Sequence, residues 1–194
     1  ALDAEGLDDV LYTAAAKGAD RLIKLNSSYA GTMTSYALAR VMANAIKTLR
    51  PDLILCGVQA HNDLDGALGP QLAEQLGMPY VGYVSGVAVS GDKATVRKEY
   101  PGGLIGEMVV TLPAVLGIQA AEKPPRYVPV SRVRQTMRSA TIEEQPAAEP
   151  EFVDGPVVTR MSSPEPVQRA EMIEGDVDVV ATRLTDLLKQ LGVL

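Results

Sequence analysis

Hydrophobic positions in the first half of the chain switch between helical and strand-like spacing. The uninterrupted apolar run 53–56 is typical of a strand buried on both faces. The spacing predicts, in order, a helix over 7–17, a strand over 21–25, a helix that Thr32 or Thr34 caps and that ends before Pro51, a strand over 53–56 and a helix over 66–76. Strands that alternate with helices across short connections predict a mostly parallel sheet.

The period changes in the middle of the chain, where polar turns separate longer runs of strand-like spacing. Gly91-Asp92 and Pro101-Gly102-Gly103 are hairpin-type turns. The runs that they join, together with one further buried strand, cover residues 80–90, 94–100, 104–112 and 114–118. The predicted fold class is therefore α/β: an open, mostly parallel nucleotide-binding sheet flanked by helices, with an antiparallel hairpin extension.

The last third of the chain is rich in proline and ends in an amphipathic segment. Residues 131–138 are compatible with a short basic helix, and residues 145–166 have the composition of an extended linker. Apolar positions share one face over 176–191, which predicts a terminal helix that packs on its own domain or on a partner. We expect a nucleotide-binding α/β domain over 1–144 and an arm ending in a helix over 145–194.

Composition excludes several classes of protein. The net charge of −6 argues against a nucleic-acid partner, which a basic surface would normally accompany. No apolar run reaches the roughly 18 residues of a membrane-spanning helix, so we expect no membrane insertion. The single cysteine, Cys56, and the single histidine, His61, make neither an intrachain disulfide nor a zinc site, and we expect no metal and no catalytic residue.

The segment from Leu53 to Gln71 carries the most chemistry, because it is a strand, a glycine-rich turn and a helix in succession. Ligands of open α/β sheets bind at the carboxyl ends of strands. Gly57 allows close approach to the backbone, and free amides at a helix N-terminus favour a phosphate. The candidate acceptors and amide donors are Asn62, Asp63, Asp65, Gly66, Ala67, Leu68 and Gly69. A plain strand–helix connection capped by Asp65 fits the same residues, whereas the absence of a G-x-x-x-x-G-K-[ST] pattern excludes a P-loop.

Several separate motifs, in order, resemble the beta (small) subunit of electron-transfer flavoproteins. They are GVQA at 57–60, GDKATVRKEYPGG at 91–103, LPAVLGIQ at 112–119 and PPRY at 124–127. The resemblance implies a heterodimer with an alpha subunit that carries the redox FAD. It also implies a non-redox AMP in this subunit, or a second FAD in flavin-bifurcating relatives.

The resemblance also implies site residues. Gly57, Gln59 and Ala60 match the AMP loop of the family, and Leu2 aligns with a further position of that site. The chain departs from the family at 66–68, where Gly-Ala-Leu replaces a common Asn-Gln-Thr. We expect the phosphate contacts there to come from backbone amides.

Two segments match partner-binding motifs of the family. Glu99 corresponds to a glutamate that faces the flavin domain of the alpha subunit; without the resemblance, a solvated hairpin charge is the favoured interpretation. Arg126, Tyr127 and Val130 match a recognition loop that docks on flavin-dependent dehydrogenases such as acyl-CoA dehydrogenase; the alternative is a rigid surface turn. The implied route runs from these dehydrogenases to a quinone-linked acceptor.

Two other readings of the fold remain open, a nucleotide-hydrolysing or adenylating enzyme and a nucleotide-binding sensor domain. The family's first strand normally precedes the segment seen here, so we expect that strand to be absent and its neighbouring strand edge to be exposed. The resemblance implies the cytoplasm of a bacterium, or the mitochondrial matrix of a eukaryote.

Overall fold

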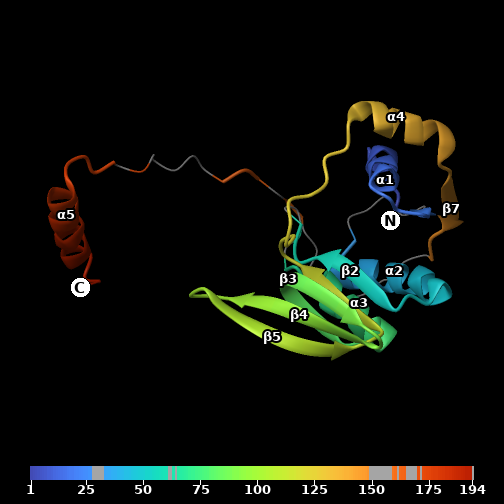
Figure 1. The fold of residues 1–194 in the computed structure, drawn as a ribbon, viewed down its shortest axis with the longest axis horizontal. Helices are drawn as coiled ribbons and strands as arrows, with labels where there is room; N and C mark the ends of the chain where they lie inside the picture. Colours follow the sequence, from blue (N-terminus) through green and yellow to red (C-terminus); the bar gives the residue numbers. More distant parts are fainter. Residues whose placement is uncertain are drawn as a thin grey trace. The chain divides into compact units, whose positions relative to one another are not determined.

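The computed structural model describes residues 1–27, 33–60, 63, 65–148, 159–160, 162–164, 170 and 172–193. They belong to two compact units, Ala1–Val157 and Val158–Leu194, which are described separately (Figure 1). The helices are α1 (Leu7–Ala16), α2 (Ser35–Leu49), α3 (Leu68–Leu76), α4 (Val130–Ser139) and α5 (Val177–Gln190). The strands are β1 (Leu22–Asn26), β2 (Leu53–Gly57), β3 (Tyr80–Ser90), β4 (Lys93–Tyr100), β5 (Leu104–Thr111), β6 (Ala114–Ile118) and β7 (Ile142–Pro146).

Five strands form the main sheet of the first unit, in the order β2-β6-β3-β4-β5. The β2–β6 and β6–β3 pairs are parallel, and β3, β4 and β5 continue the sheet as antiparallel neighbours. This topology confirms the predicted α/β class, with its mostly parallel sheet and antiparallel extension.

Two hydrophobic clusters hold this sheet and its helices together. The first consists of inward-facing residues of β3 to β6, among which Leu116 is fully buried; burying a leucine side chain stabilises a fold by about 2 kcal/mol. The second joins α2 to α3 through Ala39, Ala43 and Leu72, with Ile54 of β2 packed against it. The apolar spacing that predicts these helices therefore corresponds to the faces that pack.

β1 and β7 form a separate two-stranded parallel sheet, with Leu22 opposite Ile142. The sequence does not predict β7, because its residues are largely polar. Leu22 and Leu25 of β1 are buried. Exposed ion pairs add contacts to β7: Arg21 donates to Glu143 through Nε at 3.0 Å and Nη2 at 2.7 Å. β7 also crosses the domain division expected after residue 144, and that division stays a prediction.

β2 is one edge of the five-stranded sheet, since β6 is the neighbour with which it pairs. Leu55, in the middle of this strand, is 60% exposed although its segment reads as fully buried. Ile54 packs against the cluster of α2 and α3, and the alternation of side chains along a strand turns Leu55 to the other face of the sheet.

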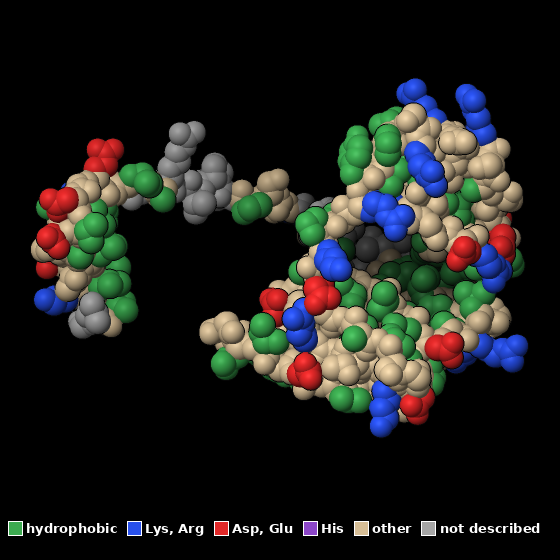
Figure 2. All heavy atoms as spheres, in the orientation of Figure 1, with side chains coloured by type: hydrophobic (Ala, Val, Ile, Leu, Met, Phe, Trp, Pro, Cys, Tyr) green, Lys and Arg blue, Asp and Glu red, His purple; other side chains and the backbone are tan. Residues whose placement is uncertain are grey.

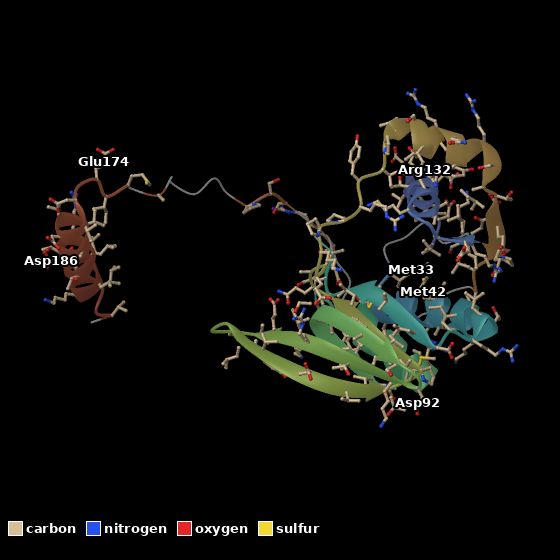
Figure 3. All side chains as sticks on the ribbon, viewed as in Figure 1. Met33, Met42, Asp92, Arg132, Glu174 and Asp186 are labelled. Carbon is tan, nitrogen blue, oxygen red and sulfur yellow. The ribbon has the colours of Figure 1, made fainter. Side chains whose placement is uncertain are left out.

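In the second unit, Asp176 begins α5 by accepting a hydrogen bond from the Val179 amide at 2.9 Å. Hydrophobic side chains line one side of this helix and acidic side chains the other (Figure 2). Asp186 lies on the acidic side (Figure 3). Within the described residues, no helix combines the length and the apolar character needed to cross a membrane.

Candidate functional site

The loop at the carboxyl end of β2 connects that strand to α3, as the sequence predicts. The helix begins at Leu68 rather than at residue 66, so that Gly66 and Ala67 belong to the loop. His61, Asn62 and Leu64 lie outside the described residues. A Cβ at Gly57 would meet no atom within 4 Å, which leaves the backbone there open to a ligand.

Gly66 closes the loop onto the end of β2. Its φ of +63° is in the left-handed region, and a Cβ there would lie 2.9 Å from the carbonyl oxygen of Val58. The Gln59 Nε2 group donates to the carbonyl of Asp63 at 3.1 Å, and the Asp63 amide donates to Ala60 at 3.0 Å. Gln59 and Ala60 thus shape the loop from within.

Ser35, at the start of α2, joins two carboxylates of this loop. Its Oγ lies 3.3 Å from Asp63 Oδ1 and 3.2 Å from Asp65 Oδ1, and its one hydrogen serves one of them at a time. Asp65 does not cap α3, because its Oδ1 accepts from the amide of Ala67, which precedes the helix, at 3.0 Å. The reading of Asp65 as a helix cap is therefore wrong.

The described residues of the loop fit a nucleotide through their backbone. Amides in the first turn of a helix have no acceptor within the helix, so Leu68 and Gly69 offer donors to a phosphate oxygen. Among the side chains described in this loop there is no cation, and the carboxylates of Asp63 and Asp65 accept from its own donors. The expectation that backbone amides contact a phosphate at 66–68 stays a prediction.

Tyr80 supports the site from beneath α3. A Cβ at Gly69, Gly82 or Gly117 would lie within 2.8, 2.7 or 2.5 Å of Tyr80 atoms, so three glycines from α3, β3 and β6 make room for this ring. Sequence reasoning missed it, because the glycines are far apart along the chain. Burial raises the pKa of the Tyr80 hydroxyl, which keeps it neutral near pH 7.

Cys56 lies beside the same ring. Burial raises the pKa of its thiol, and Sγ donates to the Leu116 carbonyl at 3.6 Å. The thiol is therefore protonated near neutral pH, as expected of an inert cysteine. Across the described part of the chain, no group of three or more His, Cys, Asp or Glu side chains is placed to hold a metal ion.

Leu2 pairs with Leu25 of β1 in an isolated parallel bridge. Its backbone neighbours also bond to β1: the amide of Asp3 donates to the Leu25 carbonyl at 2.9 Å. The structure thus places Leu2 beside the first strand, and its contribution to the nucleotide site stays a prediction.

The proposed docking residues are exposed. Glu99 lies on β4, and Tyr127 and Val130 are 83% and 65% exposed in and just after the segment that follows β6. Arg126 is also exposed, and Val130 is the first residue of α4. Basic side chains continue along α4, from which Arg132 projects (Figure 3).

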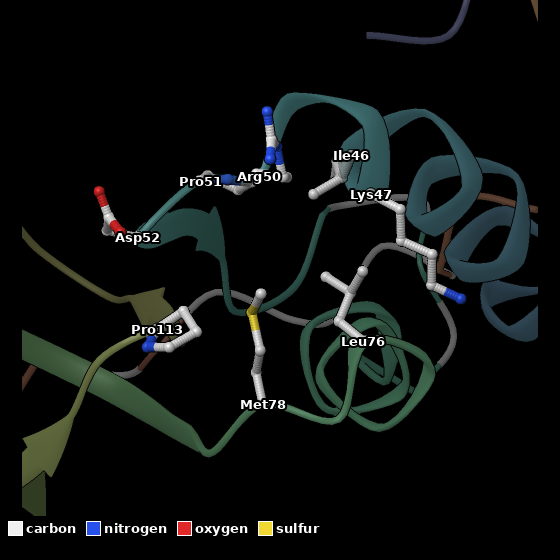
Figure 4. A pocket seen from close by; sticks show the side chains of 8 residues that line it. All are labelled: Ile46, Lys47, Arg50, Pro51, Asp52, Leu76, Met78 and Pro113. Carbon is white, nitrogen blue, oxygen red and sulfur yellow. The ribbon is translucent and has the colours of Figure 1, made fainter.

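A pocket of ≈ 280 Å³ lies at the other end of the parallel strands (Figure 4). It adjoins the residues that precede β2 and β6, so it is separate from the loop between β2 and α3. Its lining is Ile46, Lys47, Arg50, Pro51, Asp52, Leu76, Met78 and Pro113.

Comparison with known proteins identifies the family. A model described as the electron transfer flavoprotein domain matches residues 4–150. The electron transfer flavoprotein subunit beta of Methylophilus methylotrophus is 30% identical over 95% of this chain and 73% of its own length. The mitochondrial subunit beta of Oryza sativa subsp. japonica is 29% identical over 91% of this chain and 70% of its own. The acryloyl-CoA reductase electron transfer subunit gamma of Anaerotignum propionicum is 30% identical over 62% of this chain and 46% of its own. The chain therefore belongs to the electron transfer flavoprotein beta-subunit family, a family of electron-transfer proteins.

Proposed function

We propose that this chain is the beta subunit of a heterodimeric electron-transfer flavoprotein and has no catalysis of its own. Electrons from flavin-dependent dehydrogenases pass through the FAD of an alpha subunit to a quinone-linked acceptor. The observation that carries the proposal is the similarity to a beta subunit along 95% of the chain, which takes in the loop after β2 and the segment with Arg126 and Tyr127.

The first task of this subunit is to hold an adenine nucleotide in the loop between β2 and α3. The open backbone at Gly57 and the first-turn amides of α3 support this assignment. AMP is the expected ligand, and a second FAD occupies the same loop if the protein bifurcates electrons. AMP has no redox chemistry, so its role here is structural.

The second task is docking. Glu99 offers a carboxylate to an arginine on the mobile flavin domain of the alpha subunit. The exposed side chains of Tyr127 and Val130 offer an apolar anchor to the dehydrogenase, with Arg126 beside them. Exposed apolar residues next to a rigid proline-rich turn suit such an anchor, because little conformational entropy is lost on binding.

The third task is subunit assembly through the arm. The hydrophobic side of α5 includes Leu184, Leu187 and Leu188, which are 46%, 41% and 37% exposed. An isolated helix of this length is marginal in water, so packing on the alpha subunit would stabilise it.

The test is to purify the chain together with its alpha subunit, denature the complex and identify the released nucleotides by mass. One AMP and one FAD per heterodimer is the expected result, and two FAD indicates the bifurcating form. A stable heterodimer that releases only the FAD of the alpha subunit would contradict the nucleotide site. Turnover of ATP by the isolated chain would contradict the carrier role.

A further inference from the structure

One arginine of β4 reaches across a neighbouring strand instead of pairing with the carboxylate directly opposite it. Arg97 lies opposite Gly86 on β3 and opposite Glu107 on β5. Opposite charges on facing strands normally attract each other, which makes Glu107 the local partner. The Arg97 guanidinium instead forms an ion pair with Glu122, in the segment after β6.

Gly86 makes this path possible. A Cβ at this buried position would lie 2.6 Å from Arg97 Nε and 2.9 Å from Nη2, closer than real contacts allow. The register of β3 also shifts between Val84 and Gly86. Any side chain at position 86 would therefore push the guanidinium off β3, away from Glu122.

The ion pair holds the docking segment, defined here as residues 119–129, at Glu122. Backbone hydrogen bonds hold the two ends of this segment. The amide of Gln119 donates to the carbonyl of Val84 at 2.9 Å, and the carbonyl of Pro129 accepts from the amide of Arg132 at 3.0 Å. Glu122 supplies the side-chain bond between these ends. The exposed Tyr127 follows five residues later.

We propose that the Arg97–Glu122 ion pair is a tether that positions the docking segment for its protein partner. Arg97 and Glu99 are two residues apart on one strand and so lie on the same face of the sheet. The tether thus links the strand proposed to meet the alpha subunit with the segment proposed to meet the dehydrogenase. Arg97 and Glu122 are positioning residues, and this inference rests on the proposed docking function.

Trypsin provides a test that needs no partner. Within the docking segment Lys123 precedes a proline and resists cleavage, so the cut after Arg126 reports opening of the segment. Since an exposed ion pair contributes little energy, we expect Glu122→Gln and Arg97→Gln each to speed this cut by about two- to fivefold in the two-subunit complex. The double variant should be no faster than either single one, because both remove the same interaction.

Two further variants sharpen this test. Gly86→Ala should also speed the cut, since it blocks the path of the guanidinium. Glu107→Gln is the matched control: it removes the carboxylate that Arg97 bypasses and should leave the rate unchanged. Equal cleavage rates in the unaltered protein and the Glu122→Gln variant would overturn the tether, as would faster cleavage in the control.

Docking is measured separately, with a purified acyl-CoA dehydrogenase as electron donor. We expect Glu122→Gln to raise the KM for the carrier by about two- to fivefold without changing kcat, because the tether affects binding alone. Faster cleavage with an unchanged KM would overturn the docking role of the tether. If the unaltered complex accepts no electrons from this donor while the cleavage results hold, the tether stands and the proposed docking function fails.

Discussion

At the residue scale, glycines determine how closely the chain approaches itself around the candidate site. Tyr80 fills space left by three glycines, and Gly66 turns the loop back onto Val58. These contacts are tight because a backbone oxygen or an aromatic ring occupies the volume that a Cβ would take. Substitutions at these positions should therefore lower the free energy of unfolding by more than the backbone preference of glycine alone would cost.

Gly66→Ala tests this reasoning, because alanine there suffers both a left-handed backbone and a contact of 2.9 Å with the Val58 carbonyl. The left-handed conformation costs about 1–2 kcal/mol, and the contact adds to it. Gly77→Ala is the control, since Gly77 has a similar φ of +66° with nothing within 4 Å of a Cβ. Urea unfolding should show a greater loss for Gly66→Ala; equal losses would refute the tight loop closure.

Cys56 should react slowly with iodoacetamide in the folded chain. Burial raises the pKa of its thiol, so at pH 8 less of the reactive thiolate is present than in an exposed cysteine. The chain has one cysteine, so mass spectrometry reports this site alone. We expect faster modification in urea, and a native rate that rises only at higher pH. Equal rates in the native and unfolded chains would show that the thiol is accessible.

At the element scale, ion pairs and hydrogen bonds between side chains add to the backbone pairing of β1 with β7. The hydrogen bonds from Arg21 lower the pKa of Glu143, and those from Asn26 and Lys24 lower the pKa of Glu144. A lowered carboxyl pKa contributes stability above the unfolded value, and that stability is lost as the pH falls through the folded value. The pairing of these strands should therefore weaken below about pH 4.

Glu143→Gln should reproduce the acidic state at neutral pH. The variant is expected to be less stable than the unaltered chain at pH 7, with a difference that narrows toward pH 3, because the Glu143 carboxylate takes up its proton as the pH falls through its lowered pKa. Urea midpoints at the two pH values measure this. A difference that persists unchanged at pH 3 would mean that size or shape, rather than charge, is responsible.

At the scale of the whole molecule, the proposed subunit assembly depends on the apolar side of α5. Leu188→Asp should weaken assembly with the alpha subunit by at least about tenfold, because a carboxylate would lose its hydration in an apolar interface. Thr182→Asp adds the same charge on the opposite side of the helix and should leave assembly unchanged. Titration of one subunit with the other measures both variants.

Deletion of residues 149–194, which leaves β7 and its bond from Ala147 to Asn26 intact, should weaken assembly at least as much as Leu188→Asp. If the shortened chain binds the alpha subunit with undiminished affinity, the arm has no part in assembly. The two experiments together separate the contribution of α5 from that of the rest of the arm.

The sequence by itself determined the elements with local signals. Helices and strands lie within about two residues of their predicted positions, because amphipathic spacing, the Thr34 cap and the glycine turns act over a few residues. The same local signals placed the candidate loop at the end of β2, and the order of separate motifs identified the family. β7 escaped prediction because its own residues are largely polar and it forms by backbone pairing with the distant β1, so no apolar spacing marks it.

Only the tertiary structure decided which distant segments meet. It placed β6 between β2 and β3, brought Ser35 to Asp65, and packed Tyr80 against Gly117. It also sent Arg97 to Glu122 rather than to Glu107, which lies directly opposite on β5. Such contacts depend on the volumes and edges left after the sheet has formed, and the period of a local sequence pattern contains no information about them.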